Sequence, residues 1–335
     1  MGKRKKHKKQ YSFISQDFLD RLATMYDQSI FDDIIKTFVT RPTTFRVNTL
    51  LSTRQTILDI LKQQGFKIKM IPWYTDAFIL ENKTKRELTD LDIYTQGHIY
   101  IQSLASMLPP LILSPQPGET VLDLTAAPGS KTSQIAGLMH RQGELIANDK
   151  NKIRFFKLKA NMENLGVVNS EQHIENDWKC VLRMESGAVL TQEYPEYFDK
   201  ILLDAPCSAE ARFVEDDIKS FAYWKRHKIK EMAYTQRTLL FSAWQALKPG
   251  GILLYSTCTF APEENEIQIS RFLERNDNAI LMPAVMDGLE ALAMLTNWKD
   301  REVHPDVVKY TLRIKPTKYI EGFFVAKIQK KVNSK

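Results

Sequence analysis

The chain has 335 residues, of which 43% are hydrophobic and 26% charged, and it carries a formal net charge of +7. This composition is ordinary for a folded globular protein with one large or two smaller domains. No apolar run is long enough for a transmembrane helix, and three cysteines without a C-x-x-C pair argue against a disulfide framework and a four-thiolate zinc site. We therefore expect a cytoplasmic protein with no membrane partner and no bound metal.

Most of the positive charge lies in one short segment near the start of the chain. Residues 3–9 hold six lysines or arginines and no acid, whereas the remaining residues carry 41 basic against 40 acidic side chains. A segment this charged cannot bury apolar surface, so residues 1–10 are predicted to be a disordered basic tail. Such a tail suits contact with the phosphates of nucleic acid, but it also fits a solvated terminus or a nuclear address.

Residues 11–95 show short helical and strand patterns in turn. The expected elements are helical segments from residue 11 to about 45, a strand at 44–50, a helix at 53–64 closed by Gly65, strands at 66–70 and 77–80, and a loop at 82–92. These patterns predict a small α/β domain at the start of the chain.

Strands and helices alternate more regularly in residues 96–330. The expected elements are strands at 120–124, 144–149 and 322–328, further strands ending just before Asp177, Asp204 and Cys258, helices at 132–140, 152–164 and 262–275, and a turn at 248–251. This alternation predicts an α/β fold with a doubly wound, mostly parallel sheet.

The turn after the first of these strands indicates which ligand the sheet binds. It lacks the glycines of both the dinucleotide fingerprint and the phosphate-binding loop. Asp149, at the end of the second strand, suits hydrogen bonding to a ribose diol, and Asp177, at the end of the third, suits an adenine edge. A single Asp after a strand is more often a turn or helix cap, but the ordered pair favours an adenosine cofactor without phosphates, such as S-adenosylmethionine.

Two of the three cysteines follow apolar strands of the predicted sheet. Cys207 comes after the strand that ends at Asp204, and Cys258 comes after the strand at residues 252–254. Because the carboxyl ends of parallel strands share one edge, we expect both thiols in one cleft, where they favour covalent chemistry. Cys180 is expected to be a small buried hydrophobic residue instead.

Three motifs carry a resemblance to a known family. They are residues 123–132, the run Asp204-Ala205-Pro206-Cys207-Ser208 and residues 255–259, which read Tyr-Ser-Thr-Cys-Thr. Together they resemble the motifs of the Sun/Nop-type (RsmB-like) RNA cytosine-5 methyltransferases. The resemblance covers most of the chain: residues 41–49 look like the segment before the family's RNA-binding subdomain, 97–103 like its entry helix, and 321–326 like its closing strand.

The resemblance implies a Rossmann-like class I methyltransferase domain over residues 96–330 and a smaller N-terminal α/β RNA-binding domain over 11–95. It implies that Cys258 attacks C6 of the cytosine, that Cys207 assists product release, that Asp204 holds the N3/N4 edge of the base, and that Lys131 is a second contact that also lowers the thiol pKa. The implied S-adenosylmethionine site consists of Thr125, Ala126, Ala127, Pro128, Gly129, Ser130, Lys131, Asp149, Arg154, Asp177 and Asp204. In DNA cytosine methyltransferases the Pro-Cys thiol attacks, so the roles of the two cysteines remain open to reversal.

The expected substrate is a single-stranded or loop cytosine, because the base must leave any stack, with rRNA favoured over tRNA and the enzyme acting as a monomer. A non-catalytic RNA-binding assembly factor is the alternative.

The segment 223–228 mixes aromatic and basic residues, which suits RNA contact as well as a core helix with a basic face. The chain departs from the family at Ser208-Ala209-Glu210-Ala211, where Ser-Gly-x-Gly is usual, and this departure restricts a loop beside the target base.

Overall fold

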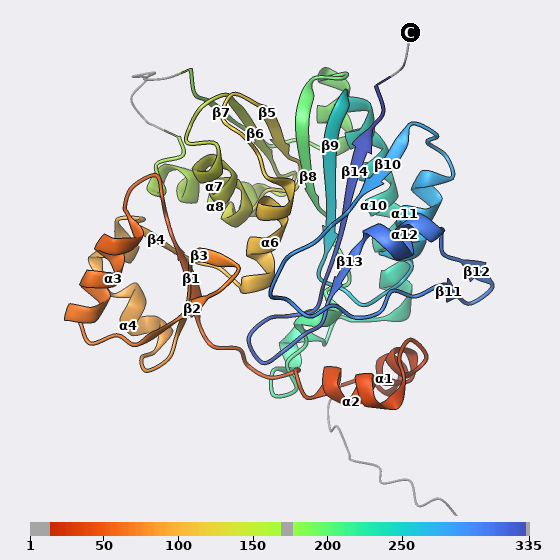
Figure 1. The fold of residues 1–335 in the computed structure, drawn as a ribbon, viewed down its shortest axis with the longest axis horizontal. Coiled ribbons are helices and arrows are strands. Elements are labelled where there is room, and N and C mark those ends of the chain that lie inside the picture. Colours follow the sequence, from red (N-terminus) through yellow and green to blue (C-terminus); the bar gives the residue numbers. More distant parts are fainter. Residues whose placement is uncertain (1–13, 169–176, 333–335) are drawn as a thin grey trace, which may run out of the picture.

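The computed structural model describes residues 14–168 and 177–332, and it contains a four-stranded sheet beside a larger, eight-stranded sheet (Figure 1). The predicted basic tail, residues 1–10, lies outside the described residues. No helix within the described ranges has the length and apolarity needed to span a membrane.

The smaller sheet is antiparallel, with the order β2-β3-β1-β4. Its elements are β1 (Thr44–Val47), α3 (Arg54–Gln63), β2 (Ile68–Ile71), β3 (Tyr74–Leu80), α4 (Lys85–Thr89), α5 (Asp92–Thr95) and β4 (Ile99–Ile101). The predicted strand at 44–50 and helix at 53–64 are confirmed, and the Thr53 side chain caps that helix by accepting a hydrogen bond from the backbone N–H of Thr56.

Two predictions for this region are wrong. The expected loop at 82–92 contains α4, whose first turn is closed by a capping box between Thr84 and Glu87. The segment 97–103, expected to resemble an entry helix, contains β4, which pairs with β1 and so extends the small sheet beyond the predicted boundary at residue 95.

The larger sheet has the strand order β10-β14-β9-β8-β5-β6-β7, with β13 paired to β14. Its strands are β5 (Thr120–Asp123), β6 (Glu144–Asn148), β7 (Lys179–Arg183), β8 (Phe198–Asp204), β9 (Leu247–Thr257), β10 (Ala279–Met282), β13 (Leu312–Ile314) and β14 (Phe323–Lys330). Strands β5 to β9 are parallel, and β14 runs antiparallel to β9. The predicted closing strand at 321–326 is therefore found as β14.

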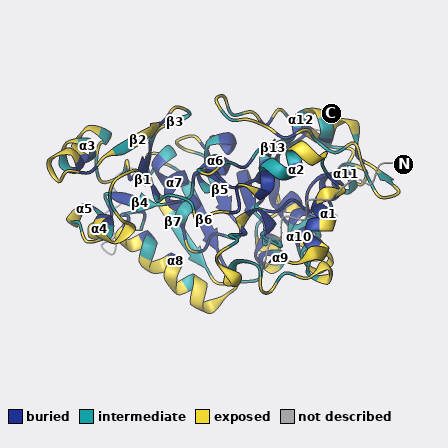
Figure 2. Ribbon diagram, turned by 90° about the horizontal axis from the view of Figure 1, so that it is seen from below, coloured by how far each residue is buried: buried dark blue, intermediate teal, exposed yellow. Residues whose placement is uncertain are grey.

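Helices cover both faces of the larger sheet (Figure 1). They are α6 (Leu104–Leu113), α7 (Ser130–Leu138) and α8 (Lys152–Asn164) on one face, and α9 (Gly187–Leu190), α10 (Arg226–Ala246), α11 (Glu266–Leu273) and α12 (Pro305–Tyr310) on the other. Successive residues of a strand contribute to opposite cores, as Leu202 and Leu203 do. The doubly wound α/β fold is confirmed, and Figure 2 shows its buried residues along the central strands and the exposed residues on outer helices such as α8.

Two boundaries within this domain differ from the predictions. The expected turn at 248–251 lies inside β9, which pairs with β8 through a register shift there. The expected helix at 262–275 is shorter, because α11 begins only at Glu266. A small hairpin, β11 (Asn297–Trp298) and β12 (Arg301–Glu302), was not predicted.

The first two helices pack against the larger domain and lie away from the small sheet (Figure 1). They are α1 (Gln16–Ala23) and α2 (Gln28–Ile35), and Asp27 caps α2 by accepting from the N–H of Ile30. The Phe18 ring lies 4.9 Å from that of Phe213, which belongs to the loop after β8. These helices therefore share a core with the predicted methyltransferase domain, whereas the predicted unit 11–95 grouped them with the small sheet.

One buried arginine ties the small sheet to the larger domain. Arg46 on β1 donates through Nε to Gln102 Oε1 at 2.8 Å and through Nη2 to Ser133 Oγ of α7 at 2.6 Å. Burying a guanidinium is costly unless its N–H groups are satisfied, so these contacts fix the position of α7 relative to β1.

Candidate active site

The carboxyl ends of β5, β6, β8 and β9 surround a cleft with two lobes. The first lobe, of about 430 Å³, is lined by Asp149, residues 186–188 and Tyr234, among others. The second, of about 590 Å³, is lined by Tyr100, Ser106, Lys131, Glu321 and others. Six residues line both lobes: Thr125, Ala127, Arg154, Asp204, Arg212 and Cys258. Ligand clefts at the carboxyl edge are the rule in open α/β sheets.

The two predicted thiols meet in this cleft. Cys207, on the loop after β8, and Cys258, after β9, place their sulfur atoms 3.3 Å apart. The hydrogen bond to Cys258 and the burial of its own side chain raise the pKa of Cys207 well above its ordinary value. Cys207 therefore stays protonated at neutral pH.

Asp204 is held between a cation and a hydroxyl. Its Oδ2 lies 2.6 Å from Lys131 Nζ, and its Oδ1 accepts from Ser256 Oγ at 2.8 Å. The Lys131 ammonium also donates to Ser106 Oγ at 2.8 Å. The carboxylate thus has a fixed orientation beside the thiols, and the ammonium is shared between Asp204 and Ser106.

The turn before α7 contributes Thr125 and Ala127 to both lobes. Gly129 has a φ of 105°, a backbone conformation that favours glycine, and its α-carbon faces Met162 of α8. The neighbouring Ala127 accepts from Arg154 Nη2 at 2.6 Å, and the same nitrogen lies 3.2 Å from Asp149 Oδ2. The predicted turn, Asp149 and Arg154 are therefore brought together.

The buried carboxyl of Asp123, at the end of β5, was not predicted as a site residue although it lines the second lobe. Its Oδ2 accepts from Thr132 Oγ1 at 2.7 Å, whereas its Oδ1 is buried with no hydrogen-bond partner among the described residues. Burial raises the pKa of Asp123 to about 7. This oxygen can accept a hydrogen bond from a donor that the described residues do not supply.

The prediction for Asp177 is wrong, because the structure places this residue at the other edge of the sheet. The strand expected to end at Asp177 falls mostly on residues 169–176, outside the described residues, and β7 begins after Asp177, at Lys179. Lys179 pairs with Glu144, the first residue of β6, so Asp177 lies at the amino end of the parallel strands. The residues that follow the carboxyl end of β7 and line the first lobe are 186–188, which sequence reasoning missed.

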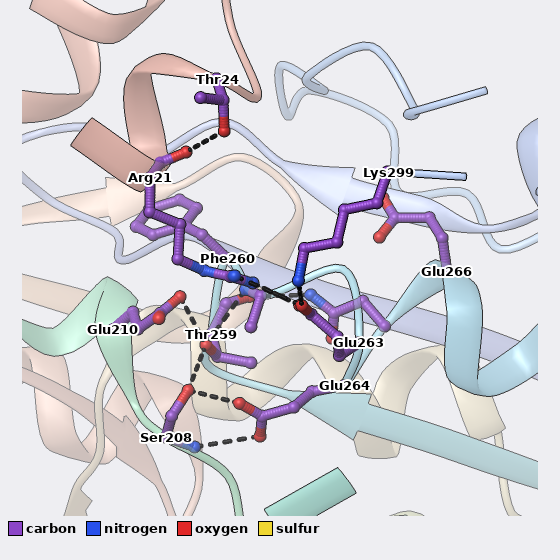
Figure 3. Close-up of polar contacts among 12 residues, drawn as sticks. Arg21, Thr24, Ser208, Glu210, Thr259, Phe260, Glu263, Glu264, Glu266 and Lys299 are labelled. Carbon is purple, nitrogen blue, oxygen red and sulfur yellow. Dashed lines mark hydrogen bonds and ion pairs between the residues drawn. The ribbon is translucent and has the colours of Figure 1, made fainter. Parts of the chain in front are cut away.

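Two buried glutamates, Glu210 and Glu264, hold the residues that follow the two cysteines, Ser208 and Thr259 (Figure 3). Glu264 accepts from the backbone N–H of Ser208 at 3.0 Å, from the Ser208 hydroxyl and from Gln236 Nε2 at 2.7 Å, and burial raises its pKa to about 8. Glu210 accepts from Thr259 Oγ1 at 2.9 Å. Both glutamates are fully buried, and each binds a residue next to one of the two cysteines. Glu264 lies in an acidic run that resembles the first turn of a helix, and Glu210 lies in the loop that departs from the family pattern.

The loop that departs from the family pattern takes a strained shape. Ala209 has φ 56° and ψ 29°, the left-handed conformation that glycine adopts freely. The next alanine, Ala211, is fully buried, and its backbone N–H donates to the Cys258 carbonyl at 3.2 Å. This geometry places Arg212, another residue that sequence reasoning missed, at the junction of the two lobes.

Burial also bears on the aromatic residues of the segment 223–228 and on the third cysteine. Trp224 packs its ring edge-on against Phe18 and donates to Glu210 Oε1 at 2.9 Å, so it belongs to the core, whereas Tyr223 is 88% exposed. Cys180 lies in β7, outside both lobes, and burial raises its pKa to about 12. Within residues 14–168 and 177–332, no group of three or more His, Cys, Asp or Glu side chains is arranged to hold a metal ion.

Comparisons with known proteins show which family the chain belongs to. A family model described as 16S rRNA methyltransferase RsmB/F matches residues 110–329, and an RsmF/B-like ferredoxin-like domain matches residues 16–86. The ribosomal RNA small subunit methyltransferase F of Vibrio vulnificus is 36% identical over 324 residues, which is 95% of this chain and 64% of that protein.

Two archaeal proteins match along nearly their whole length. The tRNA (cytosine(49)-C(5))-methyltransferase of Pyrococcus abyssi is 32% identical over 325 residues, covering 97% of this chain and 99% of that protein. The crystal structure of a methyltransferase homolog protein from Pyrococcus horikoshii superposes with a TM-score of 0.74 at 33% identity, covering 95% of this chain and all of that chain. By contrast, the chain spans about 64% of the length of the small-subunit relatives that it matches.

Proposed function

Since the chain belongs to the RsmB/F methyltransferase family, we propose that it is an S-adenosylmethionine-dependent RNA cytosine-5 methyltransferase that acts on small-subunit ribosomal RNA. The observation that carries this proposal is the pair of sulfur atoms 3.3 Å apart, beside the ion pair of Asp204 and Lys131. Two thiols in contact with a fixed carboxylate, at the ligand edge of a doubly wound sheet, suit covalent activation of a pyrimidine.

The residues present fit the cofactor. Asp149, at the end of β6, suits the ribose diol, and the unpartnered Oδ1 of Asp123 suits the ammonium of the methionine moiety. The turn before α7 presents Thr125, Ala126 and Ala127 to the cleft. When bound, S-adenosylmethionine supplies an electrophilic methyl group.

The chain's own residues make the cytosine reactive toward that group. The Cys258 thiolate forms a bond to C6, which breaks the aromaticity of the ring and places electron density on C5. Asp204, oriented by Lys131 and Ser256, accepts a hydrogen bond from the N4 amino group and holds the base beside Cys258. After C5 is methylated it gives its proton to solvent water; the electron pair of the C5–H bond forms the C5=C6 double bond, the C6–S bond breaks, and Cys258 leaves as a thiolate. Cys207, whose S–H faces Cys258, assists this release.

The test is methyl transfer from labelled S-adenosylmethionine to small-subunit rRNA that lacks the modification. We expect label in 5-methylcytidine after digestion to nucleosides, and none with Cys258→Ala. A protein that folds and binds the cofactor but labels no RNA would overturn the proposal in favour of a non-catalytic RNA-binding factor.

A second substrate is supported by the match to the archaeal tRNA enzyme, which extends over 99% of that protein. The same assay with unmodified tRNA distinguishes small-subunit rRNA from tRNA as the substrate. The preferred RNA will be labelled with the higher kcat/KM. In either case we propose that a monomer acts in the cytoplasm on an unstacked, single-stranded or loop cytosine, since a base within a stack cannot reach the thiols.

A further inference from the structure

Arg212 lies where the two lobes of the cleft join, and it lines both of them together with Cys258. Its position follows from the backbone. The left-handed Ala209 turns the chain into the short 3₁₀ helix of residues 210–212, and the hydrogen bond from the Ala211 N–H to the Cys258 carbonyl fixes that helix against the thiol.

The guanidinium of Arg212 has no ion pair and no side-chain hydrogen bond within residues 14–168 and 177–332. Arg154 also lines both lobes, but it is engaged by Asp149 and Ala127, and Lys131 binds Asp204 and Ser106. Lys150 lines the first lobe alone. Among the described residues, Arg212 is therefore the cation lining both lobes that is available to a group formed during the reaction.

The reaction requires such a cation. An ordinary thiol has a pKa of about 8.5 and is mostly protonated at neutral pH. The carboxylates of Asp204 and Glu321 line the second lobe together with Cys258 and disfavour a second negative charge there. The Cys207 S–H and a cation are the groups that offset this repulsion.

We propose that Arg212 stabilises the thiolate of Cys258 and thereby sets the pH at which the nucleophile becomes active. This inference rests on the proposed role of Cys258 as the nucleophile. The raised pKa of Arg212 agrees with it, because the negative charge of Cys258 is the largest cause. The charged and titratable groups that line the first lobe with Cys258 are Cys207, Asp149, Lys150 and Tyr234, and those that line the second are Tyr100, Asp123, Lys131 and Glu321. Asp204, Arg154 and Arg212 line both lobes, and Glu264 acts on Cys207.

The test measures the ionisation of Cys258 without turnover. The full chain, kept reduced and free of RNA and cofactor, is alkylated with iodoacetamide between pH 6 and 9, and mass spectrometry of peptides separates Cys258 from Cys180 and Cys207. For Arg212→Gln we expect the midpoint of the Cys258 profile to rise by about one pH unit, so that alkylation at pH 7 slows about tenfold. Arg212→Lys keeps the charge and is expected to restore most of the rate.

The matched control is Arg86→Gln, which removes an exposed arginine from α4, far from the cleft. It should leave the profile unchanged, and thermal unfolding should show that all three variants fold. Superimposable profiles for the wild type and Arg212→Gln would overturn the inference. A raised KM for RNA with an unchanged alkylation profile would also overturn it and make Arg212 a phosphate contact.

The alkylation assay also distinguishes a failure of this inference from a failure of the proposed function. If the wild type methylates no RNA but Arg212→Gln still shifts the profile, the activity is wrong while the effect of Arg212 on the thiol stands.

Discussion

The sulfur atoms of Cys207 and Cys258 lie 3.3 Å apart although 51 positions separate the two cysteines in the sequence. The register of the sheet explains this. Strands β8 and β9 are neighbours and parallel, and Asp204 pairs with Ser256, so each thiol follows its strand at the same edge. The same register lets Ser256 donate to Asp204. One strand pairing thus assembles the thiols and the carboxylate together.

Asp204→Asn should slow methyl transfer by about 10²- to 10⁴-fold, because the variant loses the charged group that binds the base edge and leaves Lys131 without its ionic partner. Single-turnover rates with saturating RNA measure this effect. Ser256→Ala is the matched control, since it removes only the hydroxyl that orients Asp204, and about a tenfold loss is expected. Equal, near-native rates for both variants would remove Asp204 from the mechanism.

Ala209→Gly and Ala211→Gly should change stability in opposite directions. Ala209 occupies a left-handed conformation, so glycine relieves strain and should raise the free energy of unfolding by up to about 1 kcal/mol. Ala211 is fully buried, so glycine at that position should lower the free energy by about 1 kcal/mol or more. Urea unfolding of the two variants measures the difference. A loss of stability in both would show that the Ala209 backbone is not strained.

Asp123 should make stability depend on pH. Burial raises its pKa from 3.8 to about 7, so between these values the folded protein binds more protons than the unfolded chain. Its contribution to the free energy of unfolding therefore falls as the pH rises from about 4 to 7. Asp123→Asn lacks this titration, so its stability relative to the wild type should increase between pH 5 and 8, as measured by urea unfolding. A difference that does not vary with pH would contradict the assignment.

The affinity for S-adenosylmethionine should increase with pH, whereas the contribution of Asp123 to stability decreases. The ionised carboxylate of Asp123 pairs with an ammonium, so the affinity of the wild type for S-adenosylmethionine should rise as the pH increases through about 7. Calorimetric titration of the protein with the cofactor measures this dependence. Asp123→Asn should bind more weakly at pH 8 and lose most of the pH dependence. An unchanged affinity in this variant would place the ammonium elsewhere.

The ion pair of Glu266 and Arg313 should contribute to stability without affecting the chemistry. Both side chains are fully buried, with Arg313 Nη2 2.7 Å from Glu266 Oε2, and they join α11 to β13. Glu266→Gln leaves a buried guanidinium without its counter-charge and should cost about 3–5 kcal/mol of unfolding free energy. At a temperature where the variant is folded, the pH midpoint of Cys258 alkylation should match that of the wild type. A shift of that midpoint would show that the pair acts on the thiol.

Much of the site could be predicted from the sequence because the end of a strand can be recognised from neighbouring residues alone. Short apolar runs followed by Asp204, Cys207 or Cys258 predict parallel strands, and the carboxyl ends of such strands meet at one edge. Asp177 shows where this reasoning fails. The partner of β6 is chosen by tertiary pairing, which selects residues 179–183, and no local pattern distinguishes that strand from the segment before it.

The buried glutamates could not be predicted for a different reason. Charged side chains are seldom fully buried, and the groups that satisfy Glu264 come from two other elements, the Ser208 loop and Gln236 on α10. Arg212 likewise becomes a candidate only when the backbone of Ala209 and Ala211 places it beside Cys258.

The central claim is the division of labour between the two thiols, and the most direct measurement is trapping of the covalent RNA adduct on a denaturing gel. Because Cys258 is proposed to attack and Cys207 to release, Cys207→Ala should accumulate an RNA-linked band in the presence of S-adenosylmethionine, and Cys258→Ala should form none. The double variant, as a control, should also form none. An adduct that accumulates in Cys258→Ala and is absent from Cys207→Ala would contradict the account and reverse the roles of the two cysteines.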